Sequence, residues 1–170
     1  MRKIILFIAT SLDGFIAGPR GEIDWLFTDQ DYGYKKFYSS IDTLLMGRKT
    51  YELANSFPEW PYAGKKVIVF THKKGKKDSR VEFSSNPNQV IQKIRKQKGK
   101  NAWLVGGGEV VSFFLQQKGI DEMRVFIHPL ILGKGIPLFP TRRGENSLSL
   151  QKTRKFSSGL VELHYCVMPA

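Results

Sequence analysis

Three short segments combine glycine with residues that can hold a negatively charged ligand. They are Ser11–Gly18 (Ser-Leu-Asp-Gly-Phe-Ile-Ala-Gly), Met46–Thr50 (Met-Gly-Arg-Lys-Thr) and Val105–Glu109 (Val-Gly-Gly-Gly-Glu). Glycine lets a backbone approach a ligand closely and take up a positive φ. Backbone N–H groups at a strand-to-helix junction face anions, and the Arg48 guanidinium is a planar fork of donors that suits phosphate. The segments predict a site for a phosphate-bearing ligand, although each alone also fits a structural role, such as a turn capped by Asp13.

Other kinds of site find little support in the sequence. There is no G-x-G-x-x-G fingerprint, no P-loop Gly-Lys-Ser/Thr, no G-x-S-x-G elbow and no H-E-x-x-H motif. The three histidines, His72, His128 and His164, are widely scattered, and Cys166 is the only cysteine. We therefore expect neither a metal site nor an internal disulfide.

The elements that must position these segments can be predicted from apolar runs and helix signals. Continuous apolar runs at residues 3–10, 43–46, 66–71 and 102–105 fit strands buried on both faces of a sheet. Helical patterns cover residues 29–40, 86–99 and 108–119, whereas residues 124–132 and 161–167 predict later strands, the last one after a hairpin turn at 156–160. This order predicts an α/β protein, a three-layer α/β/α domain with a central mixed sheet. The carboxyl ends of its parallel strands would line the ligand crevice.

Length and charge limit the choice further. The 170 residues make one domain, residues 1–170, and the formal net charge is +12. Residues 65–100 hold 12 Lys/Arg against 2 acidic residues. Such a stretch can attract nucleic acid or a phosphorylated small molecule, or it can simply be a solvated loop. No aromatic residue interleaves with the lysines of residues 73–77, so a stacking surface for single strands is not expected.

The apolar runs also bear on location. None approaches the roughly 18–20 residues that a membrane-spanning helix needs. The N-terminal residues 1–9 imitate a secretion signal, but their apolar stretch is short and no small-x-small cleavage site follows. We expect a cytoplasmic protein with no membrane partner.

Taken in order, the motifs resemble the dihydrofolate reductase superfamily, and more closely the reductase domain of bacterial riboflavin biosynthesis and its stand-alone relatives. Besides the three glycine segments, the resemblance rests on Val-Ile-Val-Phe-Thr-His at residues 67–72 and Gly-Glu-Ile-Asp-Trp at residues 21–25. It also rests on the run from Pro129 to Phe139, which has the pattern Pro-x-x-x-Gly-x-Gly-x-Pro-Leu-Phe. The match covers nearly the whole chain and implies a dihydrofolate reductase-like fold.

The resemblance implies that NADPH lies across the sheet. The residues flanking the nicotinamide would be Ala9, Ile16 and Ala17. Those holding the pyrophosphate and the 2′-phosphate side would be Gly47, Arg48, Lys49 and Thr50, with Thr71 and His72 near the 2′-phosphate. Because a 2′-phosphate needs cationic donors, Lys73 or Lys74 is a further candidate for binding it. Gly106, Gly107 and Gly108 would close over the pyrophosphate, and the Gly106–Gly107 peptide bond would be cis.

The implied activity is hydride transfer to a C=N or C=O bond of a small pyrimidine- or pterin-like molecule. It would be most like the 5-amino-6-(5-phosphoribosylamino)uracil reductase step, with dihydrofolate reductase as the alternative. Asp13 or Asp31 would orient polar groups or handle protons, and Trp25 would stack on the heterocycle. Asp29, Lys35 and Lys36 complete the substrate region, and these two lysines are the only basic residues available after the tryptophan to hold a ribosyl phosphate. The chain departs from the folate enzymes at Glu109, where they often carry arginine.

Two hypotheses of another class remain open. One is a nucleotide-binding homologue without turnover. The other is a basic nucleic-acid-binding module, which uses the 65–100 stretch but leaves the glycine segments unexplained. The resemblance also implies a homodimer formed through the late strands, with Phe126, Val161, Leu163 and Tyr165 as candidates for the shared surface.

Overall fold

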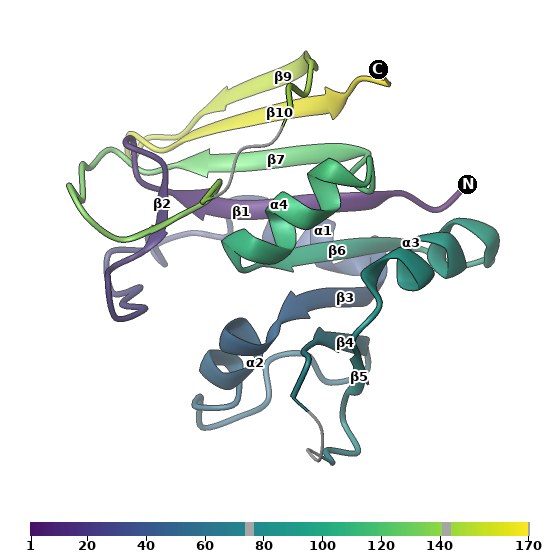
Figure 1. Ribbon diagram of the computed structural model, residues 1–170. Coiled ribbons are helices and arrows are strands. Elements are labelled where there is room, and N and C mark those ends of the chain that lie inside the picture. Colours follow the sequence, from purple (N-terminus) through teal and green to yellow (C-terminus); the bar gives the residue numbers. More distant parts are fainter. Residues whose placement is uncertain (74–76, 141–143, 170) are drawn as a thin grey trace.

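Eight strands form one twisted sheet in the computed structural model, which describes residues 1–73, 77–140 and 144–169 (Figure 1). The strand order is β5-β4-β3-β6-β1-β7-β10-β9. The bounds are β1 Ile4–Thr10, β3 Ile41–Gly47, β4 Lys66–Phe70, β5 Glu82–Ser84, β6 Asn101–Gly106, β7 Glu122–Ile127, β9 Leu148–Lys155 and β10 Val161–Val167. From β5 to β7 in this order each strand is parallel to the next one, whereas β10 is antiparallel to both β7 and β9. The predicted mixed sheet is confirmed.

Helices cover both faces of the parallel part of the sheet. On one face, Leu6 and Leu104 of the strands pack with Ile91 of α3 (Pro87–Lys96) and Phe114 of α4 (Gly108–Gln116). On the other face, neighbouring strand residues such as Ile5 pack with side chains of α1 (Tyr34–Ser39) and α2 (Arg48–Ala54). Successive strand residues point to opposite faces, so continuous apolar runs fill two cores at once. The predicted three-layer α/β/α architecture follows from this alternation.

A second, two-stranded sheet lies beside the carboxyl end of β1. It pairs β2 (Phe15–Ala17) with β8 (Ile136–Pro137) in antiparallel fashion. The first glycine segment is therefore tied to a part of the chain that lies about 120 residues later.

The helix predicted over residues 29–40 is too long. Its first turn does not form, because Tyr32 and Gly33 both have positive φ, 52° and 84°. The Asp31 carboxylate accepts hydrogen bonds from the N–H groups of Gly33 and Lys35, each at 3.1 Å. A side chain that satisfies backbone donors in this way favours a turn over a continued helix. The helix begins only at Tyr34.

Of the described helices, none lies along β7, β10 and β9 on the face that α3 and α4 cover elsewhere (Figure 1). Val125, Leu163 and Tyr165 point to that face, since Leu163 pairs with Val125 in the antiparallel ladder. Leu148 and Leu150 of β9 extend the same face and are 42% and 53% exposed. No helix of the described residues is long and apolar enough to cross a membrane.

Candidate functional site

The predicted ligand-binding segments meet at one edge of the sheet. Strands β4, β3, β6 and β1 are consecutive neighbours and run parallel, so their carboxyl ends face the same edge. Thr71, Gly47, Gly106 and Ala9 lie at those four ends or next to them. The edge is the place where open α/β sheets bind ligands.

The second and third glycine segments touch one another. The Gly107 N–H group donates a hydrogen bond to the Thr50 hydroxyl at 3.1 Å. A Cβ added to Gly47 would lie 3.1 Å from the Val110 side chain, tighter than ordinary packing allows. The two junctions therefore pack closely through the Thr50 hydroxyl and the Val110 side chain, an approach that a side chain at Gly47 would hinder.

The Gly106–Gly107 peptide bond is trans, because no cis bond occurs in the described residues, and the expectation of a cis bond is wrong. The chain turns out of β6 through the φ of Gly106, which is 138° and suits only glycine. Gly108 is needed for space, since a Cβ there would come within 2.5 Å of the Pro137 carbonyl oxygen. At Gly107, by contrast, an added Cβ would meet only the Thr50 hydroxyl, at 3.6 Å.

Arg48 is half-buried at the start of α2 and already holds a carboxylate. One guanidinium nitrogen, Nη1, donates to both Glu52 carboxylate oxygens, at 2.7 and 2.9 Å. The pair is one helical turn apart, so a phosphate that binds Arg48 must share or displace Glu52. Lys49 is exposed beside it.

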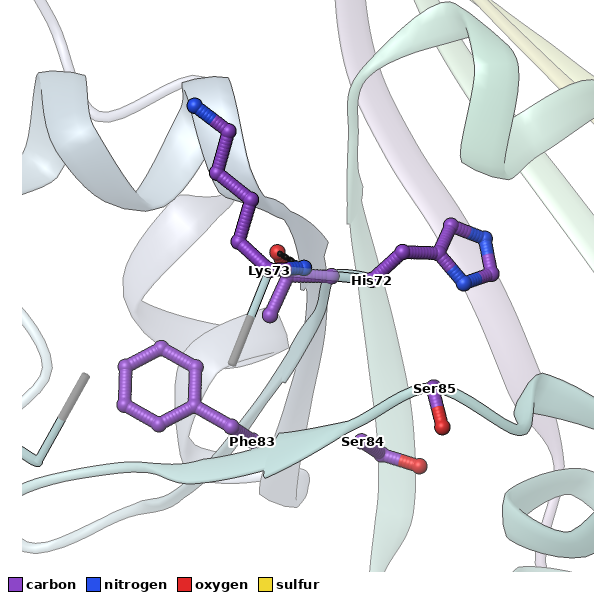
Figure 2. Close-up of a pocket in the computed structure, with 6 residues that line it drawn as sticks. His72, Lys73, Phe83, Ser84 and Ser85 are labelled. Atoms are coloured by element: carbon purple, nitrogen blue, oxygen red, sulfur yellow. Dashed lines mark hydrogen bonds between the residues drawn. The ribbon is translucent and has the colours of Figure 1, made fainter. Parts of the chain in front are cut away.

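An open pocket of about 340 Å³ lies where β4 and β5 end (Figure 2). It is lined by Thr71, His72, Lys73, Phe83, Ser84 and Ser85. The Thr71 N–H group donates to the Ser84 carbonyl oxygen at 3.0 Å, and the Lys73 N–H group donates to the Thr71 hydroxyl at 3.1 Å. Figure 2 shows the Lys73 ammonium and the His72 ring extending away from this turn in different directions. Phe83, Ser84 and Ser85 had no signal in the sequence; Lys74 lies outside the described residues.

Asp13 joins two loops at the end of β1. Its carboxylate accepts hydrogen bonds from the Ser11 hydroxyl at 2.6 Å and from the N–H groups of Leu132 and Gly133 at 3.1 and 2.8 Å. The hydroxyl, and then the amides, hold the pKa of Asp13 below its ordinary value, because they stabilise the charged form. Asp13 is thus an ionised acceptor that fixes loop geometry, and a proton-donating role is not what these contacts favour.

Two of the residues predicted to flank the nicotinamide lie in the small sheet of β2 and β8. Ile16 and Ala17 belong to β2, and Ala17 pairs with Ile136 of β8. The Leu138 N–H group donates to the Gly14 carbonyl oxygen at 2.9 Å. A Cβ at Gly135 would lie 2.3 Å from the Ala17 carbonyl oxygen. The Pro129–Phe139 run therefore forms the outer wall of the first glycine segment.

Trp25 lies against a buried histidine, His128, for which the sequence predicted no role. His128 is 3% exposed, and its ring stands edge-on to Trp25 with 5.1 Å between centroids. The Phe27 N–H group donates to His128 Nε2 at 3.2 Å, so Nδ1 carries the proton and donates to the Phe126 carbonyl oxygen at 3.3 Å. Burial lowers the pKa of His128, which favours this neutral form. His128 thus anchors the segment that carries Trp25.

The remaining predicted substrate residues lie on the loop and helix that follow. Asp29 accepts a hydrogen bond from the Tyr32 hydroxyl at 2.6 Å, and Asp31 caps the turn before α1. Lys35 and Lys36 are exposed on α1. Within the part of the chain that the structure describes, no side-chain contact joins these four residues to the edge where the glycine segments meet. Their assignment to substrate stays a prediction.

Part of the basic 65–100 stretch is used within the fold. The Lys65 ammonium donates to the carbonyl oxygens of Tyr38 and Ile41, at 3.0 and 2.7 Å. Arg80 pairs with Asp78 at 2.7 Å, and Lys66 pairs with Glu82 at 2.7 Å. These contacts occupy three of the twelve basic side chains of the stretch, and its net charge stays positive.

Comparison with known proteins identifies the family of the chain. The model of one protein family, described as the RibD C-terminal domain, matches residues 2–162. The chain belongs to this family. YwjB of Bacillus subtilis (strain 168), an uncharacterized protein, is 39% identical over 170 residues that cover 96% of this chain and 97% of its own length.

Solved structures agree. A crystal structure from Shewanella sp. PV-4, whose name assigns it to riboflavin biosynthesis, superposes with a TM-score of 0.87 and is 31% identical, covering 98% of this chain and 99% of its own. The deaminase/reductase of Thermotoga maritima, named for 5-amino-6-(5-phosphoribosylamino)uracil reduction, has a TM-score of 0.76 and 18% identity; the match covers 98% of this chain but 57% of that protein. The resemblance to riboflavin-type reductases is confirmed, and by family the chain is an oxidoreductase of the dihydrofolate reductase-like fold.

Proposed function

We propose that the protein is an NADPH-dependent reductase that sends hydride to a C=N or C=O bond of a small pyrimidine-like heterocycle. The observation that carries the proposal is the meeting of the glycine segments 46–50 and 105–109 at the ends of adjacent parallel strands, with the segment 11–18 at the end of the next strand. Membership of the RibD C-terminal domain family supports the reductase activity.

The residues at the sheet edge fit a dinucleotide. At Gly107 an added Cβ would have only the Thr50 hydroxyl within 4 Å, at 3.6 Å, so the backbone there is open to a ligand. Arg48 offers a guanidinium, and the pocket beside Thr71 offers hydroxyls and Lys73 for the 2′-phosphate end. Gly107 is the N-cap of the nine-residue helix α4, which begins at Gly108 and whose first N–H groups favour a pyrophosphate. Glu109 in that first turn disfavours additional negative charge close by.

NADPH, when bound, would supply the hydride, and the chain's own residues would position the acceptor. Ala9 is small and half-buried at the end of β1, so it leaves room for a flat ring. Asp13 would hold the loops around that ring by accepting three hydrogen bonds, and the His128 anchor would hold Trp25 beside it. Asp31 remains the proposed residue for handling protons or orienting a substrate amine.

We further propose that the protein acts in the cytoplasm as a homodimer. The uncovered face of β7, β10 and β9 supports the pairing, because its exposed leucines would gain from burial. Val161, Leu163 and Tyr165 are half-buried in the monomer. Phe126, in contrast, is 4% exposed and packs in the monomer's own core on the opposite face, so its expected place in a shared surface is wrong.

The test is a titration followed by a turnover screen. NADPH and NADH are titrated against the protein by fluorescence, and pyrimidines and dihydropterins are then screened at the nicotinamide absorbance. We expect tighter binding of NADPH and turnover of at least one pyrimidine. Failure to bind either nucleotide, together with duplex DNA binding whose logarithmic affinity falls steeply with salt, would instead favour the nucleic-acid-binding alternative. Binding without turnover of any heterocycle would favour the non-catalytic homologue.

A further inference from the structure

Two arginines that are 30 residues apart in the sequence converge on one point beside Gly33. Arg124 belongs to β7 and Arg154 to β9, on the sheet face that α1 covers. A Cβ built on Gly33 would lie 3.8 Å from Arg124 Nη2 and 4.0 Å from Arg154 Nη1. Two like charges held this close repel one another unless an anion shares them.

Both guanidinium groups are held in place by aromatic rings. Arg124 lies over Phe7 at 5.0 Å from the ring centroid, and over Phe37 and Phe126 at 5.7 and 5.8 Å. Arg154 lies over Phe156 at 4.4 Å. Guanidinium groups fixed in this way lose little further freedom on binding a ligand, which favours affinity.

Among the described residues, a single carboxylate, that of Glu162, forms an ion pair with either of these guanidinium groups. Arg124 Nε donates to the buried Glu162 carboxylate at 2.7 Å. Among the described residues, no ion pair joins Arg154 to a carboxylate. Asp31, the acidic residue nearest in the chain to Gly33, has its carboxylate on the backbone N–H groups of Gly33 and Lys35. One guanidinium charge is left over.

The loop over the arginines carries backbone strain at Tyr32. Tyr32 has a φ of 52°, a conformation that an aromatic residue rarely adopts. Its hydroxyl bonds to Asp29 at 2.6 Å and to the Ser158 hydroxyl at 2.8 Å, and its ring packs on Phe156 at 4.8 Å. Strain of this kind is found where a fold positions groups for a ligand.

The register of β1 and β7 links this point to the proposed hydride-transfer site. Arg124 pairs with Phe7, and Phe126 pairs with Ala9. Phe7 and Ala9 point to the same face, one same-face step of about 7 Å apart. A substrate ring beside Ala9 could therefore extend a substituent to the arginines.

We propose that Arg124 and Arg154 bind an oxyanion substituent, phosphate or carboxylate, of the heterocyclic substrate. The assignment rests on the proposed reductase function for its position beside Ala9, but oxyanion binding itself does not require NADPH. The sequence pointed only to Lys35 and Lys36 for this task, because the arginines come from strands that lie much later in the chain.

The test measures oxyanion binding without turnover. Inorganic phosphate and succinate are titrated separately against the wild type, and binding is followed by thermal stabilisation. Arg154→Met is compared with Lys152→Met, which removes the same charge from the same face of β9, one same-face step away. Arg124→Lys keeps a charge beside Glu162 but loses the planar fork. The affinity compared is that for whichever of phosphate and succinate binds the wild type more tightly. We expect Arg154→Met and Arg124→Lys to lower this affinity about tenfold, and Lys152→Met to lower it less than twofold.

A second comparison separates this site from the cofactor site. Arg48→Ala should leave the Arg154-dependent part of the binding unchanged, and Arg154→Met should leave NADPH affinity unchanged. The inference is overturned if neither oxyanion stabilises the wild type saturably, or if Lys152→Met weakens binding as much as Arg154→Met. If the wild type does not bind NADPH, the proposed function is overturned. The arginine site is then still decided by the oxyanion titration alone.

Discussion

Arg48 is the residue on which cofactor choice should depend most. Its guanidinium lies at the junction that would hold the phosphates, and charge-assisted hydrogen bonds contribute about 1.5–3 kcal/mol each. We expect Arg48→Ala to weaken NADPH roughly ten- to a hundredfold, by the same conversion, and NADH much less. Fluorescence titration of both cofactors measures the difference, and equal losses for the two would contradict the assignment.

Glu52 supplies the matched variant for this prediction. Its carboxylate accepts two hydrogen bonds from Arg48, so it competes with an incoming phosphate. Glu52→Gln keeps the shape of the side chain and removes the charge, and it should raise NADPH affinity a few-fold. Weaker NADPH binding in this variant would show that Glu52 serves to position Arg48.

Asp13 should make stability depend on pH. Its folded-state pKa lies below the ordinary 3.8, chiefly because the Ser11 hydroxyl and then the Gly133 and Leu132 amides bond to the charged form. A lowered pKa means that its contribution is present above about pH 4 and is lost as the pH falls through the folded-state value. Asp13→Asn should flatten that part of the curve, measured by thermal unfolding between pH 6 and 2.

The control for Asp13 is Asp24→Asn, which removes an exposed carboxylate from the neighbouring loop. Amide hydrogen exchange at Leu132 and Gly133 adds a local measurement, and it should accelerate in Asp13→Asn alone. Identical pH curves for the two variants would show that the loop contact contributes nothing measurable.

At the start of α4, Gly108 is needed for close packing, whereas Gly107 leaves the backbone open to a ligand. A Cβ at Gly108 would collide with the Pro137 carbonyl oxygen and with Pro140, whereas one at Gly107 meets only Thr50 at ordinary contact distance. We expect Gly108→Ala to lower the free energy of unfolding by about 1–3 kcal/mol, the usual cost of overpacking. Gly107→Ala should keep most stability and lose NADPH affinity.

Denaturant unfolding and cofactor titration on both variants check this prediction. An unchanged NADPH affinity in Gly107→Ala would mean that the glycines serve only close packing of the helix on the sheet. This expectation for Gly107→Ala requires no cis bond, because the chain turns out of β6 through the φ of Gly106.

For the whole molecule, the uncovered face of β7, β10 and β9 predicts the oligomeric state. Leu150 is already 53% exposed, so Leu150→Glu should affect the monomer's own packing little while placing a charge in an apolar interface. We expect a dimer mass for the wild type and a monomer mass for this variant by light scattering at micromolar concentration. Ser149→Glu places the same charge on the opposite face of β9 and should stay dimeric.

The sequence by itself determined the central strands and the helices between them, and it placed the glycine segments at the ends of strands. Residues 161–167 were predicted as the final strand and form β10, and Asn86 caps α3 as its pattern indicated, by accepting from the Gln89 N–H group at 3.1 Å. Such features depend on neighbours within a few residues, so apolar periodicity and capping side chains reveal them. The glycine segments could be placed at strand ends for the same reason.

Only the tertiary structure decided which distant groups share a contact. Asp13 accepts from the Leu132 and Gly133 amides, and His128 accepts from the Phe27 N–H group 101 residues away. Arg124 and Arg154 both approach Gly33. The helix expected from residue 29 begins at Tyr34, because the Asp31 carboxylate and two positive φ angles form a turn instead. Strand register and loop closure bring these residues together, and neither is encoded in local spacing.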